Sequence, residues 1–272
     1  MGPTTINPSV AVMNSIDIPE TKRGLEYPRR WSIWIGYDPR ETDAYLVTCA
    51  SIRRYWPDAP IQPLVLSRLQ VEGFYQRPWR REGSRLVDVI SDAPMSTEFA
   101  ISRFLIPHLV REQTKQDRLC GWALFMECDM MVRDSLDALF TYDAENQKYA
   151  VMCVKHRYEP STETKMDGQI QTVYPRKNWS SFMLINCDHP ANLVLTPEIV
   201  NSWAGRDLHA FKWLDDELIG ALDPSYNWLV GDQPEPDDVR VVHYTLGVPA
   251  MQGRENAPYA DEWRAHLDRI AA

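Results

Sequence analysis

The sequence predicts an α/β fold: a mixed, mainly parallel β-sheet with helices on both faces, in a single domain over residues 31–272. Through the first half of the chain, apolar runs of strand length alternate with segments of helical periodicity, which is typical of a mainly parallel sheet. The 272 residues are 44% hydrophobic and 25% charged, which is enough for one large core. No internal repeat or break in composition marks a second domain.

The N-terminal elements follow from simple patterns. Residues 1–30 are polar and contain several prolines, so we expect a loosely ordered arm. The apolar run 31–36 predicts a strand that ends in a turn. Apolar residues at helical spacing predict a helix over 41–55, which Pro57 ends. Two further apolar runs predict strands over 61–66 and 86–90.

The middle of the chain continues the alternation. A helix is predicted from Ser96 or Thr97 to about Arg111, with a kink or an interruption at Pro107. The apolar run 122–126 predicts a buried strand. A short helix and a strand then follow, over 134–140 and 149–154.

A polar segment without periodicity, 155–178, separates these elements from the rest of the chain. A connection of this length in a compact domain is usually functional or mobile, so we expect it to order over a bound ligand. The elements predicted after it are strands over 181–186 and 239–243 and helices over 196–203 and 213–222.

Charge and cysteine content exclude several classes of protein. A net charge of −9 argues against nucleic acid or an anionic membrane surface as the main partner. The five cysteines are odd in number and form no Cys-x-x-Cys, which argues against a disulfide scaffold or a zinc site. We therefore expect a cytoplasmic protein. The absence of any run of about 18 apolar residues predicts no integral membrane contact, and we expect no secretory signal.

The strand over 122–126 runs directly into Glu127 and Asp129. Side chains alternate along an extended chain, so these two carboxylates project to the same side, while Cys128 points the other way. Paired carboxylates at the carboxyl end of a buried strand suit Mn²⁺ or Mg²⁺, and ligands bind at that end of open α/β sheets. The alternative is a buried strand that ends in a solvated acidic turn. His243 closes the last predicted strand and can reach the same edge as a third ligand.

Six segments in order carry a resemblance to a known family. They are 33–38, 100–107 with Arg103, 125–132 with the acidic pair, 178–186 with Ser181, 214–219 with Asp216, and 241–249 with His243. In this order they resemble the motifs of the family 8 glycosyltransferases, which are retaining enzymes on the GT-A fold. The resemblance covers residue 33 to about residue 251. It implies a metal-dependent transfer of a sugar, with retention, from a nucleotide-sugar, in first place a UDP-sugar, to a saccharide or other hydroxyl acceptor.

The resemblance also implies roles for individual residues. The metal ligands are Glu127, Asp129 and His243, and the cofactor is Mn²⁺ or Mg²⁺. The residues of the donor site are Asp38, Arg103, Glu127 and Ser181. Asp216 is the catalytic residue beside the anomeric carbon, as transition-state stabiliser or nucleophile. For Asp38 the alternative is an Asp-Pro turn, for Asp216 an exposed helix start, and for His243 a core or surface histidine.

The departures from the family pattern predict a divergent member. Glu127 replaces the first aspartate of the Asp-x-Asp motif, and Trp179 falls where the family has asparagine. Glu217 replaces glutamine, and Val248 replaces the lysine that would neutralise the donor diphosphate. Two other functions therefore stay open. One is a nucleotidyltransferase, although the chain lacks a glycine-rich phosphate loop after its first strand. The other is a non-catalytic nucleotide- or sugar-binding module with a decayed metal site.

Overall fold

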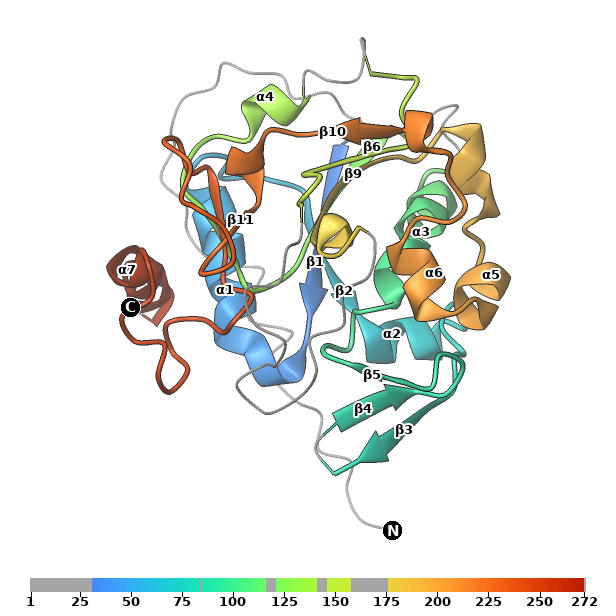
Figure 1. Ribbon diagram of the computed structural model, residues 1–272, viewed down its shortest axis with the longest axis horizontal. Coiled ribbons are helices and arrows are strands. Elements are labelled where there is room, and N and C mark those ends of the chain that lie inside the picture. Colours follow the sequence, from blue (N-terminus) through green and yellow to red (C-terminus); the bar gives the residue numbers. More distant parts are fainter. Residues whose placement is uncertain (1–30, 84, 116–120, 141–145, 158–175, 272) are drawn as a thin grey trace.

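The computed structural model describes residues 31–271 except 84, 116–120, 141–145 and 158–175. Its main sheet has six strands in the order β10-β8-β9-β6-β1-β2 (Figure 1). Their bounds are β1 Trp31–Tyr37, β2 Ile61–Val65, β6 Trp122–Met126, β8 Val151–Cys153, β9 Phe182–Asn186 and β10 Ile219–Ala221. Strand β1 pairs parallel with β2 and β6, and β10 pairs parallel with β8, whereas β9 is antiparallel to both its neighbours. The predicted mixed, mainly parallel sheet is confirmed.

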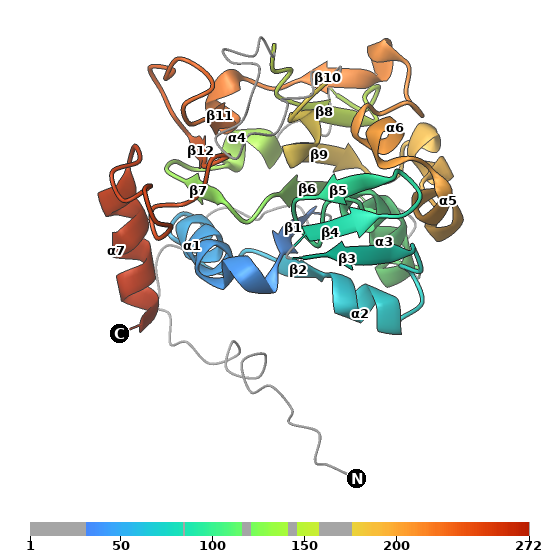
Figure 2. The same cartoon turned by 60° about the horizontal axis from the view of Figure 1, so that its bottom comes forward.

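Helices lie on both sides of this sheet (Figures 1 and 2). On one side are α1 Thr42–Arg53 and α7 Ala260–Ala271, and on the other are α2 Leu66–Val71, α3 Ile106–Gln113, α5 Pro197–Ser202 and α6 Gly205–His209. A short helix, α4, spans Asp137–Phe140. All five residues of β6 are buried, because a strand covered on both faces needs an apolar side chain at every position.

A second sheet begins where β6 ends. The chain passes through residues 127–129 into β7, Met130–Val132, which pairs antiparallel with β12, Val241–His243. Strand β12 in turn pairs parallel with β11, Trp228–Leu229. The backbone N–H of Tyr244 donates to the carbonyl of Asp129 at 3.0 Å. The acidic pair therefore lies at the junction of two sheets, at the edge where β1, β6, β8 and β10 all end.

A third, antiparallel sheet contains β3 Trp79–Glu82, β4 Arg85–Asp88 and β5 Ala93–Met95. The strand predicted over 86–90 is part of it, so that strand does not belong to the main sheet. Arg77 and Asp88 form a buried ion pair of 2.5 Å at its base. The Arg77 Nη1 atom also donates to the carbonyl of Val200 at 3.0 Å, so the hairpin is tied to α5.

The helix predicted over 96–111 is shorter than expected. A 3₁₀ turn spans Ser102–Leu105, and α3 begins only at Ile106. Pro107 lies in the first turn of α3, where a missing N–H removes no helical hydrogen bond. Pro107 therefore starts a helix and does not kink one.

The prediction of a helix over 213–222 is wrong. The structure has a 3₁₀ turn over Asp216–Leu218, and β10 follows it directly. Gly220 lets β10 approach β8, because a Cβ at this position would lie 2.7 Å from the Cγ atom of Met152. A short apolar run does not distinguish helix from strand by periodicity, and here pairing with the edge of the sheet decides the outcome.

Four cysteines, Cys49, Cys128, Cys153 and Cys187, are buried and free, and Cys120 lies outside the described residues. Within the described ranges, no helix combines the length and the apolar character that crossing a membrane requires. The arm over 1–30 and most of the segment 155–178 also lie outside the described residues. The predicted domain boundary, ligand-dependent ordering and cytoplasmic location stay predictions.

Candidate metal centre

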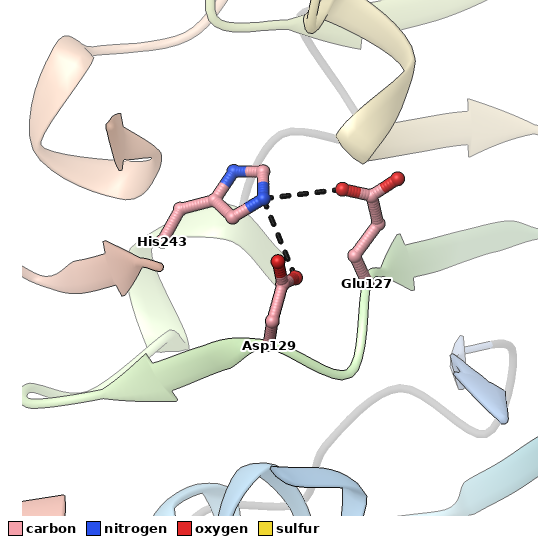
Figure 3. A group of neighbouring side chains, drawn as sticks. All are labelled: Glu127, Asp129 and His243. Atoms are coloured by element: carbon pink, nitrogen blue, oxygen red, sulfur yellow. Dashed lines mark ion pairs between the residues drawn. The ribbon is translucent and has the colours of Figure 1, made fainter. Parts of the chain in front are cut away.

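The structure brings together the three side chains predicted as metal ligands (Figure 3). One ligand atom from each of Glu127, Asp129 and His243 lies within 4.8 Å of the other two. The Nε2 atom of His243 is 3.1 Å from Glu127 Oε2 and 3.3 Å from Asp129 Oδ1. Residues more than 110 positions apart in the sequence therefore converge on one point at the edge of the sheet.

The local backbone explains this convergence. Glu127 follows β6 directly, Cys128 and Asp129 form a turn, and β7 begins at Met130, so both carboxylates lie in the short connection between the two sheets and not in the extended chain that was predicted. Cys128 between them is fully buried on the opposite side, where its thiol donates to Glu41 Oε2 at 3.2 Å. His243 pairs with Met130 in the β12–β7 register, and the backbone N–H of the next residue, Tyr244, donates to the carbonyl of Asp129, so the end of β12 lies beside the turn that carries Asp129.

The chemistry of the three groups fits a divalent cation. Asp129 Oδ1 is buried but accepts no hydrogen bond of acceptable geometry, even though His243 Nε2 lies 3.3 Å away. A buried carboxylate oxygen without a donor is stabilised by a cation. The side chains of Glu127 and Asp129 keep 21% and 23% exposure, so a bound ion is accessible to a further ligand. Two carboxylates and one imidazole are donors that a divalent cation accepts.

The charges of the centre are strongly coupled. Burial lowers the pKa of His243, but the carboxylates of Asp129 and Glu127 outweigh it and raise this pKa to about 10. Burial raises the pKa of Glu127, but Arg103 and then His243 outweigh it, so the pKa falls below its usual range. At neutral pH without metal, the positive charge between the carboxylates is thus the protonated His243.

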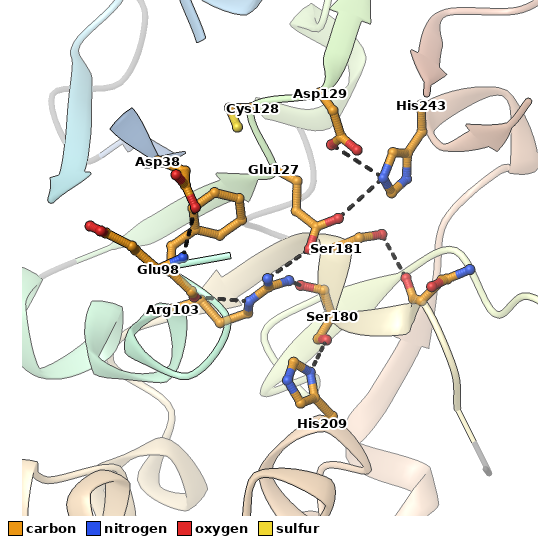
Figure 4. Close-up of polar contacts among 12 residues, drawn as sticks. Asp38, Glu98, Arg103, Glu127, Cys128, Asp129, Ser180, Ser181, His209 and His243 are labelled. Atoms are coloured by element: carbon orange, nitrogen blue, oxygen red, sulfur yellow. Dashed lines mark hydrogen bonds and ion pairs between the residues drawn. The ribbon is translucent and has the colours of Figure 1, made fainter. Parts of the chain in front are cut away.

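Arg103 is fixed against Glu127 (Figure 4). Its Nη2 atom is 2.6 Å from Glu127 Oε1, and its Nη1 atom donates to the carbonyl of Ser180 at 2.9 Å. The guanidinium lies 4.8 Å from the ring centroid of Phe125 and 5.4 Å from that of Phe99. In the structure Arg103 contacts a candidate metal ligand, and its predicted contact with the donor stays a prediction.

Ser181 is linked to the metal centre through Asn227. The Ser181 hydroxyl donates to the carbonyl of Asn178 at 2.7 Å and accepts from Asn227 Nδ2 at 2.9 Å. Asn227 Oδ1 accepts a hydrogen bond from His243 Nδ1 at 2.9 Å. Ser181 is 2% exposed and Asn227 is fully buried. Sequence reasoning singled out Ser181 and missed Asn227, since no local pattern marks an isolated asparagine beside a two-residue strand.

Asp38 lies at the end of β1 with both carboxylate oxygens occupied. Oδ1 accepts from the backbone N–H and the Nε–H of Arg40, and Oδ2 accepts from Arg40 Nη2 and from the backbone N–H of Glu98. Burial raises its pKa, but the hydrogen bonds from Arg40 outweigh this and lower it. Asp38 is fully buried, so its geometry is that of the turn residue considered as the alternative.

Asp216 lies apart from this network. It begins the 3₁₀ turn before β10, its side chain is 82% exposed, and it forms an ion pair with Arg176. Among the described residues, none of its hydrogen bonds or ion pairs reaches Glu127, Asp129 or His243. The structure thus leaves the predicted catalytic role of Asp216 as a prediction.

Two histidines that sequence reasoning did not single out, His156, which is buried, and His209, which is partly buried, border the centre. His209 Nδ1 is 2.7 Å from the hydroxyl of Ser180, and burial, followed by the charge of Arg103, lowers its pKa to about 3. His156 Nδ1 contacts Gln233 Oε1 at 3.2 Å, while its Nε2 atom is buried without a partner. Burial and then His243 lower the pKa of His156 to about 4. Both are neutral at physiological pH.

Val248, at the position of the family lysine, is 3% exposed. It packs in the smaller of two hydrophobic clusters, together with Ala44, Val47, Met131, Trp228 and Tyr244. No cation comes from this position, so any charge on a donor diphosphate has to be neutralised by other groups.

Comparison with curated proteins identifies a relative that covers most of the chain. The chain is 42% identical over 251 residues to Protein CDI of Arabidopsis thaliana, and the match covers 90% of this chain and 89% of that protein. No family model matches the chain.

Solved structures share the fold at low sequence identity. An active-site mutant of LgtC superposes with a TM-score of 0.52 at 13% identity, over 88% of this chain and 95% of that one. The bifunctional glycosyltransferase WbbM gives 0.54 at 11% identity, over 90% of this chain and 50% of that one. The glycosyltransferase GlyE of Streptococcus pneumoniae TIGR4 gives 0.51 at 14% identity, over 88% and 60%. The GT-A fold predicted from the sequence is confirmed.

Proposed function

The chain belongs to the same family as Protein CDI of Arabidopsis thaliana, and we propose that it is a metal-dependent glycosyltransferase. It moves a sugar from a nucleotide-sugar to a saccharide or other hydroxyl acceptor, with retention of the anomeric configuration. The donor that we propose first is a UDP-sugar. The name Protein CDI carries no activity, so the proposal rests on the fold and the site. The observation that supports it most is the convergence of Glu127, Asp129 and His243 at the carboxyl edge of a GT-A sheet.

Transfer from a nucleotide-sugar requires a stable diphosphate leaving group. A divalent cation, Mn²⁺ or Mg²⁺, supplies this by neutralising the charge that develops on the diphosphate oxygens. Glu127, Asp129 and His243 would hold the ion. Arg103 fixes the Glu127 carboxylate through its 2.6 Å ion pair, so this ligand needs little reorganisation when the ion binds.

The remaining roles follow from where side chains are available. Asp216 is exposed and held by one ion pair with Arg176, which has to open if its carboxylate is to reach an anomeric carbon. We propose that Asp38 stabilises the turn after β1, because its carboxylate accepts hydrogen bonds from Arg40 and from the backbone N–H of Glu98. The proposal also includes a single catalytic domain over 31–272 and a cytoplasmic location.

A panel of nucleotide-sugars with Mn²⁺, Mg²⁺ or EDTA tests this function. We expect metal-dependent hydrolysis or transfer with one donor, and a product with the anomeric configuration of the donor by NMR. The matched variant is Asp129→Asn, which keeps the shape of the side chain and removes its charge. Turnover that is equal in EDTA, or equal in Asp129→Asn, would exclude the metal-dependent reaction.

One observation favours a second candidate, a module that binds a nucleotide or sugar without transferring it. Val248 is buried in a hydrophobic cluster, so the cation expected opposite a diphosphate is missing from its usual position. Metal-dependent nucleotide binding without turnover of any donor in the panel would support this candidate. A nucleotidyltransferase is disfavoured, because the turn after β1, residues 38–41, contains no glycine that could form a phosphate-binding loop.

A further inference from the structure

We propose that Asn227 is a positioning residue of the metal centre. Its amide oxygen keeps the ring proton of His243 on Nδ1 and so leaves Nε2 as the nitrogen that binds the cation. This inference rests on the proposed function in one respect, because it takes a cation to be bound by Glu127, Asp129 and His243.

The first step concerns the ring of His243. His243 is 2% exposed, and its Nδ1 atom lies 2.9 Å from Asn227 Oδ1. An amide oxygen accepts hydrogen bonds and never donates them, so Nδ1 must carry the proton. A neutral imidazole has one N–H, and the other ring nitrogen then carries the lone pair. That nitrogen is Nε2, which faces Glu127 and Asp129 at 3.1 and 3.3 Å.

The second step concerns the orientation of the amide. The Ser181 hydroxyl has one proton and donates it to the carbonyl of Asn178 at 2.7 Å. Its oxygen is therefore an acceptor toward Asn227, and the group that faces it at 2.9 Å must be the amide NH₂. With the NH₂ directed at Ser181, the amide oxygen is directed at His243. The series of hydrogen bonds therefore has one consistent donor-to-acceptor direction: His243 to Asn227, Asn227 to Ser181, and Ser181 to Asn178.

The third step concerns the backbone that holds these groups. Asn227 immediately precedes β11, and Leu229 of β11 pairs with His243 of β12. Ser181 lies directly before β9, and its carbonyl accepts from the backbone N–H of Glu127 at 3.1 Å. Asn227 and Ser181 are therefore both held next to the strands that carry the metal ligands. This is the arrangement that orients a histidine ligand.

A comparison within the chain separates this role from ordinary burial of a polar group. Asn192 is also fully buried. Its amide donates to the carbonyls of Ala150 and Asn186 at 2.8 and 2.9 Å and accepts from the indole of Trp213 at 3.1 Å. These partners are two main-chain groups and a packing side chain. The partners of Asn227 are instead a candidate metal ligand and the serine that orients the amide.

The test is calorimetric titration with Mn²⁺ alone, in the full chain. We expect Asn227→Leu to bind Mn²⁺ about 10- to 100-fold more weakly, the usual effect of losing a group that orients a ligand. Asn227→Asp keeps an acceptor for Nδ1–H and should recover part of the affinity. Asn192→Leu, the matched control, should lower thermal stability and leave Mn²⁺ affinity unchanged.

Two further measurements keep the test decisive if Asn227→Leu does not fold. Ser181→Ala retains the amide but releases its orientation, and should weaken Mn²⁺ binding by a smaller factor. In ¹⁵N-histidine spectra of the Mg²⁺-loaded protein, the His243 ring, assigned by its loss in His243→Ala, should show a proton on Nδ1. Unchanged affinity in Asn227→Leu and Ser181→Ala, or a proton on Nε2, would overturn this inference alone. A native chain that binds no Mn²⁺ would overturn the proposed metal site itself.

Discussion

At the scale of single residues, Asp129 has the environment of a metal ligand. Its Oδ1 atom is buried without a hydrogen bond, and in the metal-free protein its carboxylate stabilises the protonated form of His243. We expect Asp129→Asn to abolish Mn²⁺ binding, measured by calorimetry, and to lower the melting temperature in EDTA because the charge beside His243 is lost. Asp134→Asn, which loses an ion pair with Arg240 near the surface, is the control. Native Mn²⁺ affinity in Asp129→Asn would remove Asp129 from the ligand set.

The protonation of His243 predicts how metal binding depends on pH. An unperturbed histidine would lose affinity for metal around pH 6 to 7. Here Asp129 and Glu127 outweigh burial and raise the pKa to about 10, so metal binding must displace a proton even at pH 8. We expect the Mn²⁺ affinity to rise by about tenfold per pH unit from pH 6.5 upward. Titrations in buffers of different ionisation enthalpy should show release of about one proton, and His243→Ala should remove this dependence.

Asp216 carries the remaining prediction at this scale. If its carboxylate acts mainly in the transition state, Asp216→Asn should lower kcat by at least about tenfold and leave the KM for the donor nearly unchanged. Asp215→Asn, on the exposed side chain next to it, should change neither constant. Equal losses in kcat and donor affinity would instead make Asp216 a residue that positions the donor.

The residues that were predictable from sequence share one property. Glu127, Asp129 and His243 each follow an apolar run, so their position at the end of a strand is readable locally. Asn227 and His209 act through partners 16 and 29 residues away, and those contacts depend on how strands register and helices pack. The sequence also did not show that both carboxylate oxygens of Asp38 accept hydrogen bonds within the fold. One of the donors is the backbone N–H of Glu98, 60 residues later.

At the scale of elements, burial decided which strands were predictable. Strand β6 is wholly apolar and buried, and it was found. Strand β3 is exposed at all four positions, so its residues carry no alternating pattern to find. Strand β10 has three residues, too few to show a period. The order of the six strands depends on β9 pairing with both β6 and β8. No local pattern in the sequence indicates these pairings.

Two glycines in the main sheet allow a matched test of how the sheet supports the site. A Cβ on Gly220 would lie 2.7 Å from Met152 Cγ, and a Cβ on Gly36 would overlap the ring of Phe99. We expect both alanine variants to lose about 1–3 kcal/mol of stability through overpacking. Because Arg103 lies over the Phe99 ring and fixes Glu127, Gly36→Ala alone should also weaken Mn²⁺ binding.

Thermal melts and calorimetry on the two variants separate these effects. If Gly220→Ala weakens Mn²⁺ binding as much as Gly36→Ala, the metal centre responds to general loss of stability. If neither variant weakens it, the position of Glu127 does not depend on Phe99 and Arg103.

At the scale of the whole molecule, three histidines with strongly shifted pKa values predict how stability depends on pH in the metal-free protein. His209 and His156 have folded pKa values of about 3 and about 4, below the unfolded value of about 6.5. Below pH 6.5 the unfolded chain therefore binds more protons, and stability falls with falling pH. His243 has a folded pKa of about 10, so between pH 6.5 and 10 the folded chain binds more protons, and stability falls with rising pH.

The metal-free chain should thus be most stable near pH 6.5. Each histidine should lower the free energy of unfolding by up to about 1.4 kcal/mol per pH unit, His156 and His209 below pH 6.5 and His243 above it. Melting temperatures from pH 4 to 10 in EDTA measure this. His209→Gln should flatten the acid side alone, and His243→Gln the alkaline side alone. Bound Mn²⁺ replaces the His243 proton, so saturating Mn²⁺ should remove the alkaline loss and leave the acid side in place. An alkaline loss that persists in both Mn²⁺ and His243→Gln would mean that other groups than the candidate metal centre govern stability above pH 7.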